Sequence, residues 1–523
     1  MMNRNIELFD STLRDGAQAE GIAFSVEDKL NIVRALDRLG VSCIEAGNPG
    51  SNPKDLEFFE RARKLKLTHA QLVAFGSTCR KDTAPVDDAN LRALLGAGTD
   101  TVAVFGKSWD LHAEKILGVS LQENLRMIAQ TVDYLRSQGR RVIFDAEHFF
   151  DGYKANPAYA LETLRAAFEA GADVLALCDT NGGCFPHEIG EITAAAAAAL
   201  PWAKLGIHCH NDTGCAVANA LAAVRAGAVH VQGTYLGFGE RCGNTNLSTL
   251  IPDLQLKCGY ALLPEENLHL LTPTANEIAE ICNTSVKRGE PFVGRSAFAH
   301  KAGMHADGVL KCHESFEHID PERVGNARRI LMSEMSGRAA VLQKISRIAP
   351  HLGRDAPEVA DIIGELKRLE HLGYQFDGAE GSFEMLVLKE LGKFHSSFEL
   401  VSYRVLDERP YDNGHSSTAT LKIKVGGTLK IAAADGDGPV NALDKALREA
   451  LCSFYPELEH IHLIDYKVRV MEPKDATAAT VRVLITSTDG AEVWSTVGVS
   501  SDVIEASWLA LVDSIEYKLR HLS

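Results

Sequence analysis

The sequence predicts an α/β protein: a (β/α)8 TIM barrel, then a helical subdomain, then a C-terminal duplicated α+β domain, within 523 residues. Three observations support this prediction. Over roughly the first 240 residues, short β-branched runs alternate with segments of helical periodicity. The runs begin about 24 to 41 residues apart, a spacing typical of successive strand–helix units. Beyond residue 271 the alternation stops, and the C-terminal part changes to strands that carry a weak internal repeat.

The predicted barrel strands are short, rich in apolar residues, and followed by polar ones. They are expected at Ile6–Leu13, Cys43–Asn48, Gln71–Ser77, Thr101–Lys107, Val142–His148, Val174–Thr180, Leu205–Asp212 and Val229–Gly237. A doubly wound open sheet is the alternative for such alternation, but no Gly-x-Gly-x-x-Gly motif follows the first run. Eight strands with seven intervening helices favour the closed barrel.

The first intervening helix carries its own start and stop signals. Ser25 and Asp28 form a capping pair, an apolar stripe runs through Leu30–Leu36, and Gly40 ends the helix. Comparable helices are expected at Leu121–Ser137, Pro157–Ala170 and Ala216–Ala226.

Changes in pattern predict three domains: the barrel at 1–271, a helical linker subdomain at 272–394 and a third domain at 395–523. Two segments, 295–318 and 376–383, are expected to interrupt the helical subdomain. The third domain holds no concentration of catalytic residue types, so we expect it to sense a ligand or to dimerise.

The third domain repeats a unit of strands followed by a helix. The first copy contains Leu400–Val405, Ala419–Ile423 and a helix at Val440–Leu451. The second copy contains Leu463–Val468, Ala479–Val483 and a helix at Val503–Leu519.

Composition excludes several functional classes. The 54 basic and 70 acidic residues give a net charge of −16, which disfavours nucleic acid as a partner. No run approaches the ~18 apolar residues that a membrane span needs, and no signal peptide is expected at the N-terminus. The 11 cysteines form no Cys-x-x-Cys pair, which indicates reduced thiols. We therefore expect a soluble cytoplasmic protein, most simply an enzyme.

Polar residues recur where the predicted strands end, which is the rim that carries active sites in barrels of this kind. His208 and His210 lie two apart on a strand and therefore face the same side. An isolated His-x-His is often coincidence, but Asp15 ends the first strand at the same rim. Two imidazoles and a carboxylate form a metal-binding set with open positions, to which Asn244 could add an oxygen.

Other rim residues have a structural and a functional interpretation. Arg14 is either a surface ion pair or a clamp for a developing oxyanion. Glu147 is either a solvated strand end or a general base, and Thr180 either begins a turn or binds a substrate carboxylate. His300 and His305, taken singly, are interpreted as structural.

Three motifs resemble the signatures of the 2-isopropylmalate, homocitrate and citramalate synthase family. They are Leu13–Gln18 with Lys29 after ten further residues, Leu205–Gly214, and Gly239–Asn244. Their order, spacing and strand positions all agree with the family. The likeness continues through His300–Gly308, Met335–Arg338 and the duplicated C-terminal domain.

The resemblance implies roles for individual residues. It implies a divalent metal ion (zinc, manganese or magnesium) with four ligands: Asp15, His208, His210 and Asn244. It implies that Arg14 steadies the enolate or ketone oxygen, that Glu147 is the base, and that Thr180 contacts the keto-acid carboxylate. It also implies that a helical subdomain delivers His305 to a partner's barrel.

The reaction implied by the resemblance is a Claisen-type condensation of acetyl-CoA with a 2-keto acid. Segments 48–55 and 376–383 most resemble the pyruvate-using branch, which serves isoleucine biosynthesis, whereas 145–148 is more polar than that branch leads us to expect. Alternatives are 2-oxoisovalerate or 2-oxoglutarate as substrate, a retro-aldol or retro-Claisen lyase, and a metabolite sensor without catalysis.

The duplicated domain resembles the family's allosteric dimer domain. The resemblance therefore implies a homodimer whose effector is a branched-chain amino acid, isoleucine first and leucine as the alternative.

Overall fold

The computed structural model contains two compact units. One comprises Met1–Phe298 and Ile319–Arg328, and the other comprises Ala299–His318 and Arg329–Ser523. The structure describes residues 5–300, 308–309, 311–330, 338–353, 356–376, 378–407, 417–471, 479–490 and 492–522. In these residues no helix combines the length and apolar character needed to cross a membrane.

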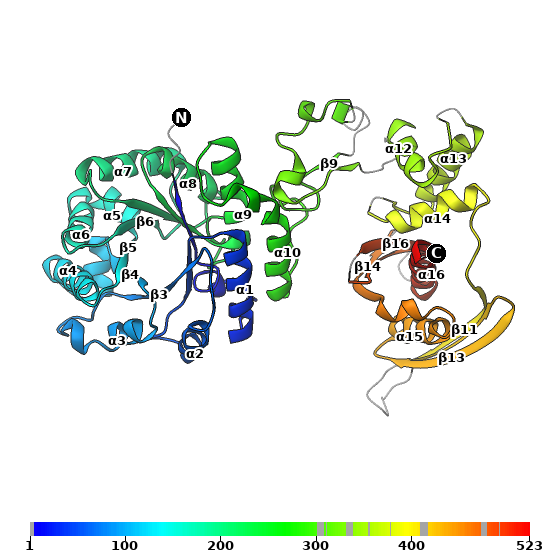
Figure 1. The fold of residues 1–523 in the computed structure, drawn as a ribbon, viewed down its shortest axis with the longest axis horizontal. Helices are drawn as coiled ribbons and strands as arrows, with labels where there is room; N and C mark the ends of the chain where they lie inside the picture. Colours follow the sequence, from blue (N-terminus) through cyan, green and yellow to red (C-terminus); the bar gives the residue numbers. More distant parts are fainter. Residues whose placement is uncertain are drawn as a thin grey trace. The chain divides into compact units, whose positions relative to one another are not determined.

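A closed barrel of eight parallel strands forms the first unit, as the sequence predicts (Figure 1). The strands are β1 Glu7–Asp10, β2 Cys43–Gly47, β3 Gln71–Ser77, β4 Thr101–Lys107, β5 Arg141–Glu147, β6 Val174–Asp179, β7 Leu205–Cys209 and β8 His230–Gly233. Each strand pairs with its neighbour in sequence, and β8 closes the barrel on β1 with Glu7 opposite His230.

Helices surround the barrel (Figure 1). They are α1 Val26–Leu39, α2 Pro53–Ala62, α3 Ala89–Gly96, α4 Leu121–Ser137, α5 Phe149–Ala155, α6 Pro157–Glu169, α7 Pro186–Ala199 and α8 Ala216–Arg225, followed by α9 Leu247–Pro252 and α10 Leu271–Ile281. The predicted capping signals of α1 are confirmed: Ser25 and Asp28 form a capping box, and Gly40 ends the helix with a φ of 101°.

Several strands end earlier than the sequence pattern predicts, because polar side chains turn the chain there. β1 ends at Asp10, three residues before the predicted end. The Asp10 carboxylate accepts hydrogen bonds from the backbone N–H of Thr12 at 2.9 Å and from its hydroxyl at 3.0 Å. This turn brings residues 14 and 15 to the rim.

The barrel interior has an apolar layer and a polar layer. An apolar cluster takes one residue from each of the first six strands: Phe9, Cys43, Val73, Ala103, Ile143 and Val174. Two residues further along, on the same side of each strand, stand Glu45 and Asp145, and both are buried. The polar layer therefore lies toward the end of the barrel where the strands terminate.

The second unit begins with β9 Ala299–His300 paired with β10 Arg329–Ile330. Helices α12 Arg338–Ile348, α13 Pro357–His371 and α14 Glu380–Glu390 follow. The expectation that 376–383 interrupts the helices is wrong for its second half, since α14 begins at Glu380. Gly381 packs so closely that an added Cβ would lie 2.9 Å from Thr496 Cγ2, so glycine here permits packing and does not break the helix.

The predicted duplication is confirmed. The first copy comprises β11 Glu399–Asp407, β12 Ser417–Val425, β13 Thr428–Gly436 and α15 Pro439–Cys452, and the second comprises β14 His462–Val470, β15 Val481–Thr488, β16 Val493–Ser500 and α16 Val503–Leu522. Each copy forms a three-stranded antiparallel sheet with one helix. Both first strands carry a register shift, between Leu400 and Ser402 and between Leu463 and Asp465, at corresponding positions of the repeat.

Candidate active site

Two histidines and one carboxylate converge at the barrel rim. Asp15 Oδ2 lies 3.2 Å from His208 Nε2 and 3.8 Å from His210 Nε2, and the two Nε2 atoms lie 3.4 Å apart. All three residues are buried. These separations suit donor atoms that share one ion at about 2.0–2.2 Å, so the set fits a divalent cation. In the part of the chain that the structure describes, it is the one group of three such side chains with ligand atoms this close.

Asn244 comes from the loop after β8 and pairs with His210 through an isolated bridge. Its Nδ2 lies 3.0 Å from Asp15 Oδ2 and 3.3 Å from His208 Nε2. Its buried Oδ1 has no hydrogen-bond partner among the described residues. Gly239 makes room for this amide, since a Cβ there would lie 1.8 Å from Asn244 Oδ1. The amide therefore lies beside the cluster with its nitrogen toward Asp15 and His208, and Asn244 as an oxygen ligand stays a prediction.

The local charges favour a cation. Burial alone would raise the pKa of Asp15, but Arg14 and both histidines outweigh burial and hold this pKa well below its usual range. Burial and the neighbouring His208 lower the pKa of His210 to about 4. At neutral pH the site therefore offers a carboxylate and at least one neutral imidazole, which are the ligand forms that a metal requires.

Arg14 is fixed from several sides. Its Nε donates to Glu45 Oε2 at 2.7 Å, its guanidinium carbon lies 3.9 Å from the Phe75 ring centroid, and one terminal nitrogen lies 3.4 Å from Asp15. Burial would lower the pKa of Arg14, but the Glu45 and Asp15 carboxylates raise it. Ser11 also donates to Glu45 Oε2, so the carboxylate that orients Arg14 is itself held in place.

Glu147 ends β5 and forms an ion pair with Lys107 at the end of β4. The pair is partly buried, with side-chain exposures of 24% for Glu147 and 13% for Lys107. Asn124 anchors this strand end by donating to the Lys107 carbonyl at 2.8 Å. The ion pair holds the Glu147 carboxylate at the end of the strand, on the wall of the cavity described below.

Thr180 follows β6 and is tied to its neighbours. Its hydroxyl oxygen accepts the backbone N–H of His148 at 2.9 Å, and its carbonyl accepts from Arg241 at 2.8 Å. Arg241 is in turn held by Asp212 through two contacts of 2.8 and 3.0 Å. Because the Thr180 oxygen acts as an acceptor, its hydrogen remains to be donated to a ligand.

A cavity of about 240 Å³ brings these groups together. Its lining includes six predicted site residues: Arg14, Asp15, Glu147, Thr180, His208 and His210. The remaining lining residues are Gln18, Phe75, Phe105, Asp145, Cys178 and Glu240.

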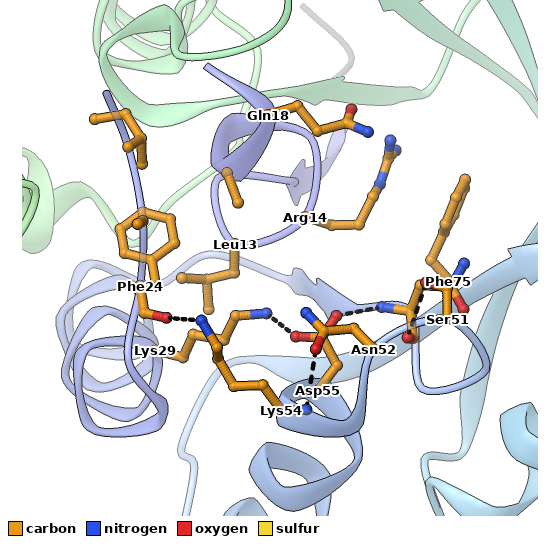
Figure 2. A pocket seen from close by; sticks show the side chains of 14 residues that line it. Leu13, Arg14, Gln18, Phe24, Lys29, Ser51, Asn52, Lys54, Asp55 and Phe75 are labelled. Atoms are coloured by element: carbon orange, nitrogen blue, oxygen red, sulfur yellow. Dashed lines mark hydrogen bonds and ion pairs between the residues drawn. The ribbon is translucent and has the colours of Figure 1, made fainter. Parts of the chain in front are cut away.

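An adjoining cavity of about 390 Å³ lies between the loop after β1 and the start of α2. Figure 2 shows the side chains that line it. Arg14, Gln18 and Phe75 line both cavities. A buried ion pair between Lys29 and Asp55 forms part of its wall, and Lys29 also donates to the Ala46 carbonyl at 2.9 Å. The lysine of the first signature motif therefore fastens α1 to β2 and α2.

Not every predicted residue lies at this site. His305 lies outside the described residues. His300 belongs to β9 in the second unit, where its Nε2 lies 3.0 Å from Glu317 Oε1.

Several site residues were missed by sequence reasoning: Glu45, Phe75, Phe105, Lys107, Asp145 and Gln232. Each lies inside a strand or at its last residue, so the sequence pattern alone does not distinguish it from a residue that packs the barrel. The available signal was a charged residue in an otherwise apolar run, as Glu45 is in β2 and Asp145 in β5.

Three known families match consecutive parts of the chain. The HMGL-like family matches residues 5–278, the homocitrate synthase post-HMGL domain-like family matches 292–373, and the LeuA allosteric (dimerisation) domain matches 377–519. Fold, site and matches together define a class of condensing enzymes built from an HMGL-like barrel followed by a LeuA-type domain.

Full-length relatives narrow this class. The (R)-citramalate synthase of Aquifex aeolicus is 50% identical, over 99% of this chain and 98% of its own length. That of Geobacter sulfurreducens is 48% identical, over 98% of this chain and 97% of its own length. The 2-isopropylmalate synthase of Pyrococcus furiosus is 31% identical, over 98% of this chain and 99% of its own length. The chain belongs to the (R)-citramalate synthase family.

Proposed function

We propose that this enzyme condenses acetyl-CoA with pyruvate to give (R)-citramalate and CoA, as a step of isoleucine biosynthesis. The observation that carries the proposal is the convergence of Asp15, His208 and His210 beside Arg14 in one small cavity. Zinc, manganese and magnesium are all compatible with these ligands. When bound there, the ion supplies Lewis acidity that polarises the keto group.

The residues around the cavity carry out the remaining steps of the reaction. The Thr180 hydroxyl donates to the keto-acid carboxylate and orients the substrate. Glu147 takes a proton from the acetyl methyl group, and its ion pair with Lys107 holds the carboxylate in position. The resulting enolate carbon forms the new bond to the keto carbon, and water then cleaves the thioester and releases CoA.

Arg14 stabilises the negative charge that develops on oxygen during bond formation. Its guanidinium is already oriented by Glu45 and Phe75, so little reorganisation is needed at the moment of reaction. The predicted contribution of His305 from a partner's subdomain remains part of this proposal.

The preference for pyruvate is supported by the aromatic wall of the cavity. Phe75 and Phe105 stack with their ring centroids 5.4 Å apart and their planes at 20°. A methyl group fits against such a wall, whereas the branched side chain of 2-oxoisovalerate adds two further methyl groups that require space.

For acetyl-CoA, we propose that the adjoining cavity receives the part of the thioester that extends away from the reacting carbon. The two cavities share Arg14, Gln18 and Phe75, so one ligand can occupy both. Lys54 lies on the wall of the larger cavity and offers a positive charge near its edge.

We propose a homodimer formed through the duplicated domain. Leu406, Leu429 and Ile431 are each more than half exposed on its first sheet, and a second copy of the chain would cover them. Isoleucine, the end product of this route, is the proposed feedback effector. Calorimetry on the full-length enzyme should detect isoleucine binding, and absence of both isoleucine and leucine binding at millimolar concentration contradicts the regulatory role.

A keto-acid panel tests the proposed function. The enzyme is incubated with acetyl-CoA, Mn²⁺, a thiol reagent and each of pyruvate, 2-oxoisovalerate and 2-oxoglutarate. Pyruvate should give the highest kcat/KM for CoA release. A higher value for 2-oxoisovalerate moves the enzyme to 2-isopropylmalate synthesis, and no CoA release with any keto acid contradicts catalysis of this kind.

A further inference from the structure

Gln232 on β8 lies at the centre of a buried polar network below the cavity. Its Oε1 lies 3.0 Å from His208 Nδ1. Its Nε2 lies 2.9 Å from Asp145 Oδ1 and 3.3 Å from His230 Nε2. All four side chains are at most 6% exposed, so water does not compete for these contacts. Each polar atom of the amide therefore has a protein partner.

The environment of Gln232 fixes which way its amide faces. His230 Nδ1 lies 2.8 Å from Glu7 Oε2, and Glu7 also pairs with Arg141 at 2.7 Å. Because Glu7 accepts a hydrogen bond from His230 Nδ1, the Nε2 atom of the neutral His230 imidazole is left as an acceptor. Two acceptors, His230 Nε2 and Asp145 Oδ1, thus face one end of the amide. That end must be the NH2 group.

The opposite end, Oε1, then faces His208. A carbonyl oxygen can only accept, so His208 Nδ1 must carry a proton. In a neutral imidazole with a proton on Nδ1, the lone pair lies on Nε2, which is the atom directed at Asp15 and His210. A reversed amide would set oxygen against two acceptors and leave its NH2 group facing His208.

We propose that Gln232, held by Asp145, is a positioning residue that fixes the metal-binding tautomer of His208. The proposal rests on the proposed function in so far as it assumes a cation at the rim. His210 has no comparable contact, since its buried Nδ1 has no hydrogen-bond partner among the described residues. The network therefore acts on one of the two imidazoles, and metal affinity should depend on residues that do not touch the metal.

Mn²⁺ binding to the full-length, chelator-treated enzyme tests this, measured by calorimetry at pH 8. The variants are Gln232→Leu, which removes the acceptor for His208, and Asp145→Val, which removes the acceptor for the amide. Both should weaken Mn²⁺ binding at least about tenfold. Asp145→Asn is the matched control, because its side-chain oxygen still accepts from Gln232. It should stay within about threefold of the unmodified enzyme.

Binding by Gln232→Leu or Asp145→Val within threefold of the unmodified enzyme overturns the proposal. Equal losses in Asp145→Val and Asp145→Asn also overturn it, since a charge effect would then explain both. If Gln232→Leu does not fold, the two Asp145 variants decide. The ratio of affinities is independent of the keto acid used, so an enzyme that fails with pyruvate can still confirm or contradict the role of Gln232.

Discussion

At the scale of single residues, the account depends on the imidazoles of His208 and His210, whose Nε2 atoms lie 3.4 Å apart beside Asp15. His208→Ala or His210→Ala should lower kcat/KM by about a thousandfold or more, because each removes a proposed ligand of the metal ion. The fold should persist, since both residues lie at the rim. Steady-state CoA release and circular dichroism check these outcomes.

The exposed His69 supplies the control for these variants, since its substitution by alanine should leave kcat/KM unchanged. A His208→Ala enzyme that keeps more than a tenth of the activity would rule out the metal centre as described.

Asp145 gives a pH-dependent prediction. Burial, with the nearby Glu45 charge, raises its pKa from 3.8 to about 7. The carboxyl therefore stabilises the fold fully below about pH 4, and this contribution is lost as the pH rises through 7. Asp145→Asn removes the titration. Its free energy of unfolding, relative to the unmodified enzyme, should be higher at pH 8 than at pH 5 by on the order of 2 kcal/mol.

Urea unfolding of the metal-free proteins at the two pH values measures this difference. If the free energy of unfolding changes equally with pH in the two proteins, Asp145 titrates normally in the folded state and the prediction is wrong.

The convergence of Asp15, His208 and His210 was predictable from sequence because it follows local rules. His208 and His210 share a face through the two-residue period of a strand, and Asp15 follows a strand that ends at the same rim. Gln232 and Lys107 were not predictable in this way. Their partners, Asp145 and Glu147, belong to other strands, and only the barrel's closure and register bring these side chains together.

At the scale of elements, the loop after β8 holds Asn244 in place through Gly239. Gly239→Ala would force a Cβ to within 1.8 Å of Asn244 Oδ1. The loop must then shift, and we expect kcat/KM and Mn²⁺ affinity each to fall about tenfold or more. Gly227→Ala is the closer control, because Gly227 also has a positive φ, 116° against 157° at Gly239, but no atom lies within 4 Å of its added Cβ.

Kinetics and calorimetry on the two glycine variants distinguish crowding from backbone strain. Equal effects of Gly239→Ala and Gly227→Ala would mean that the contact with Asn244 is unimportant.

Element positions were predicted better than element ends. The sequence pattern places β3, β4 and α4 at their observed bounds, because apolar periodicity extends over their whole length. It extends β1 and β7 too far, because the predicted runs continue into the polar residues that form the site. It misses the start of α14, where Gly381 is required by packing against Thr496 and not by a turn.

At the scale of the whole molecule, the proposed dimer depends on the first sheet of the duplicated domain. Leu429 and Ile431 are neighbours on one face of β13, exposed by 53% and 54%. Ile431→Glu should convert the dimer to a monomer, because a charge would be buried at the interface. Analytical ultracentrifugation measures the change. Lys445→Glu is the control, because Lys445 is exposed on α15, the helix that packs on the other face of this sheet, and the dimer should survive it.

A dimer that survives Ile431→Glu would place the interface elsewhere on the duplicated domain. The domain boundaries at 271 and 394 stay a prediction, since the described residues divide into two units and not three.

The central claim is that the Asp15, His208 and His210 cluster makes this chain a metal-dependent condensing enzyme for pyruvate. Its most direct test is chiral analysis of the product from acetyl-CoA and pyruvate, before and after chelation and after restoring Mn²⁺. We predict (R)-citramalate in amounts equal to the CoA released, its loss on chelation, and its recovery with Mn²⁺. Undiminished product from fully chelated enzyme, or CoA release without citramalate, would contradict the claim.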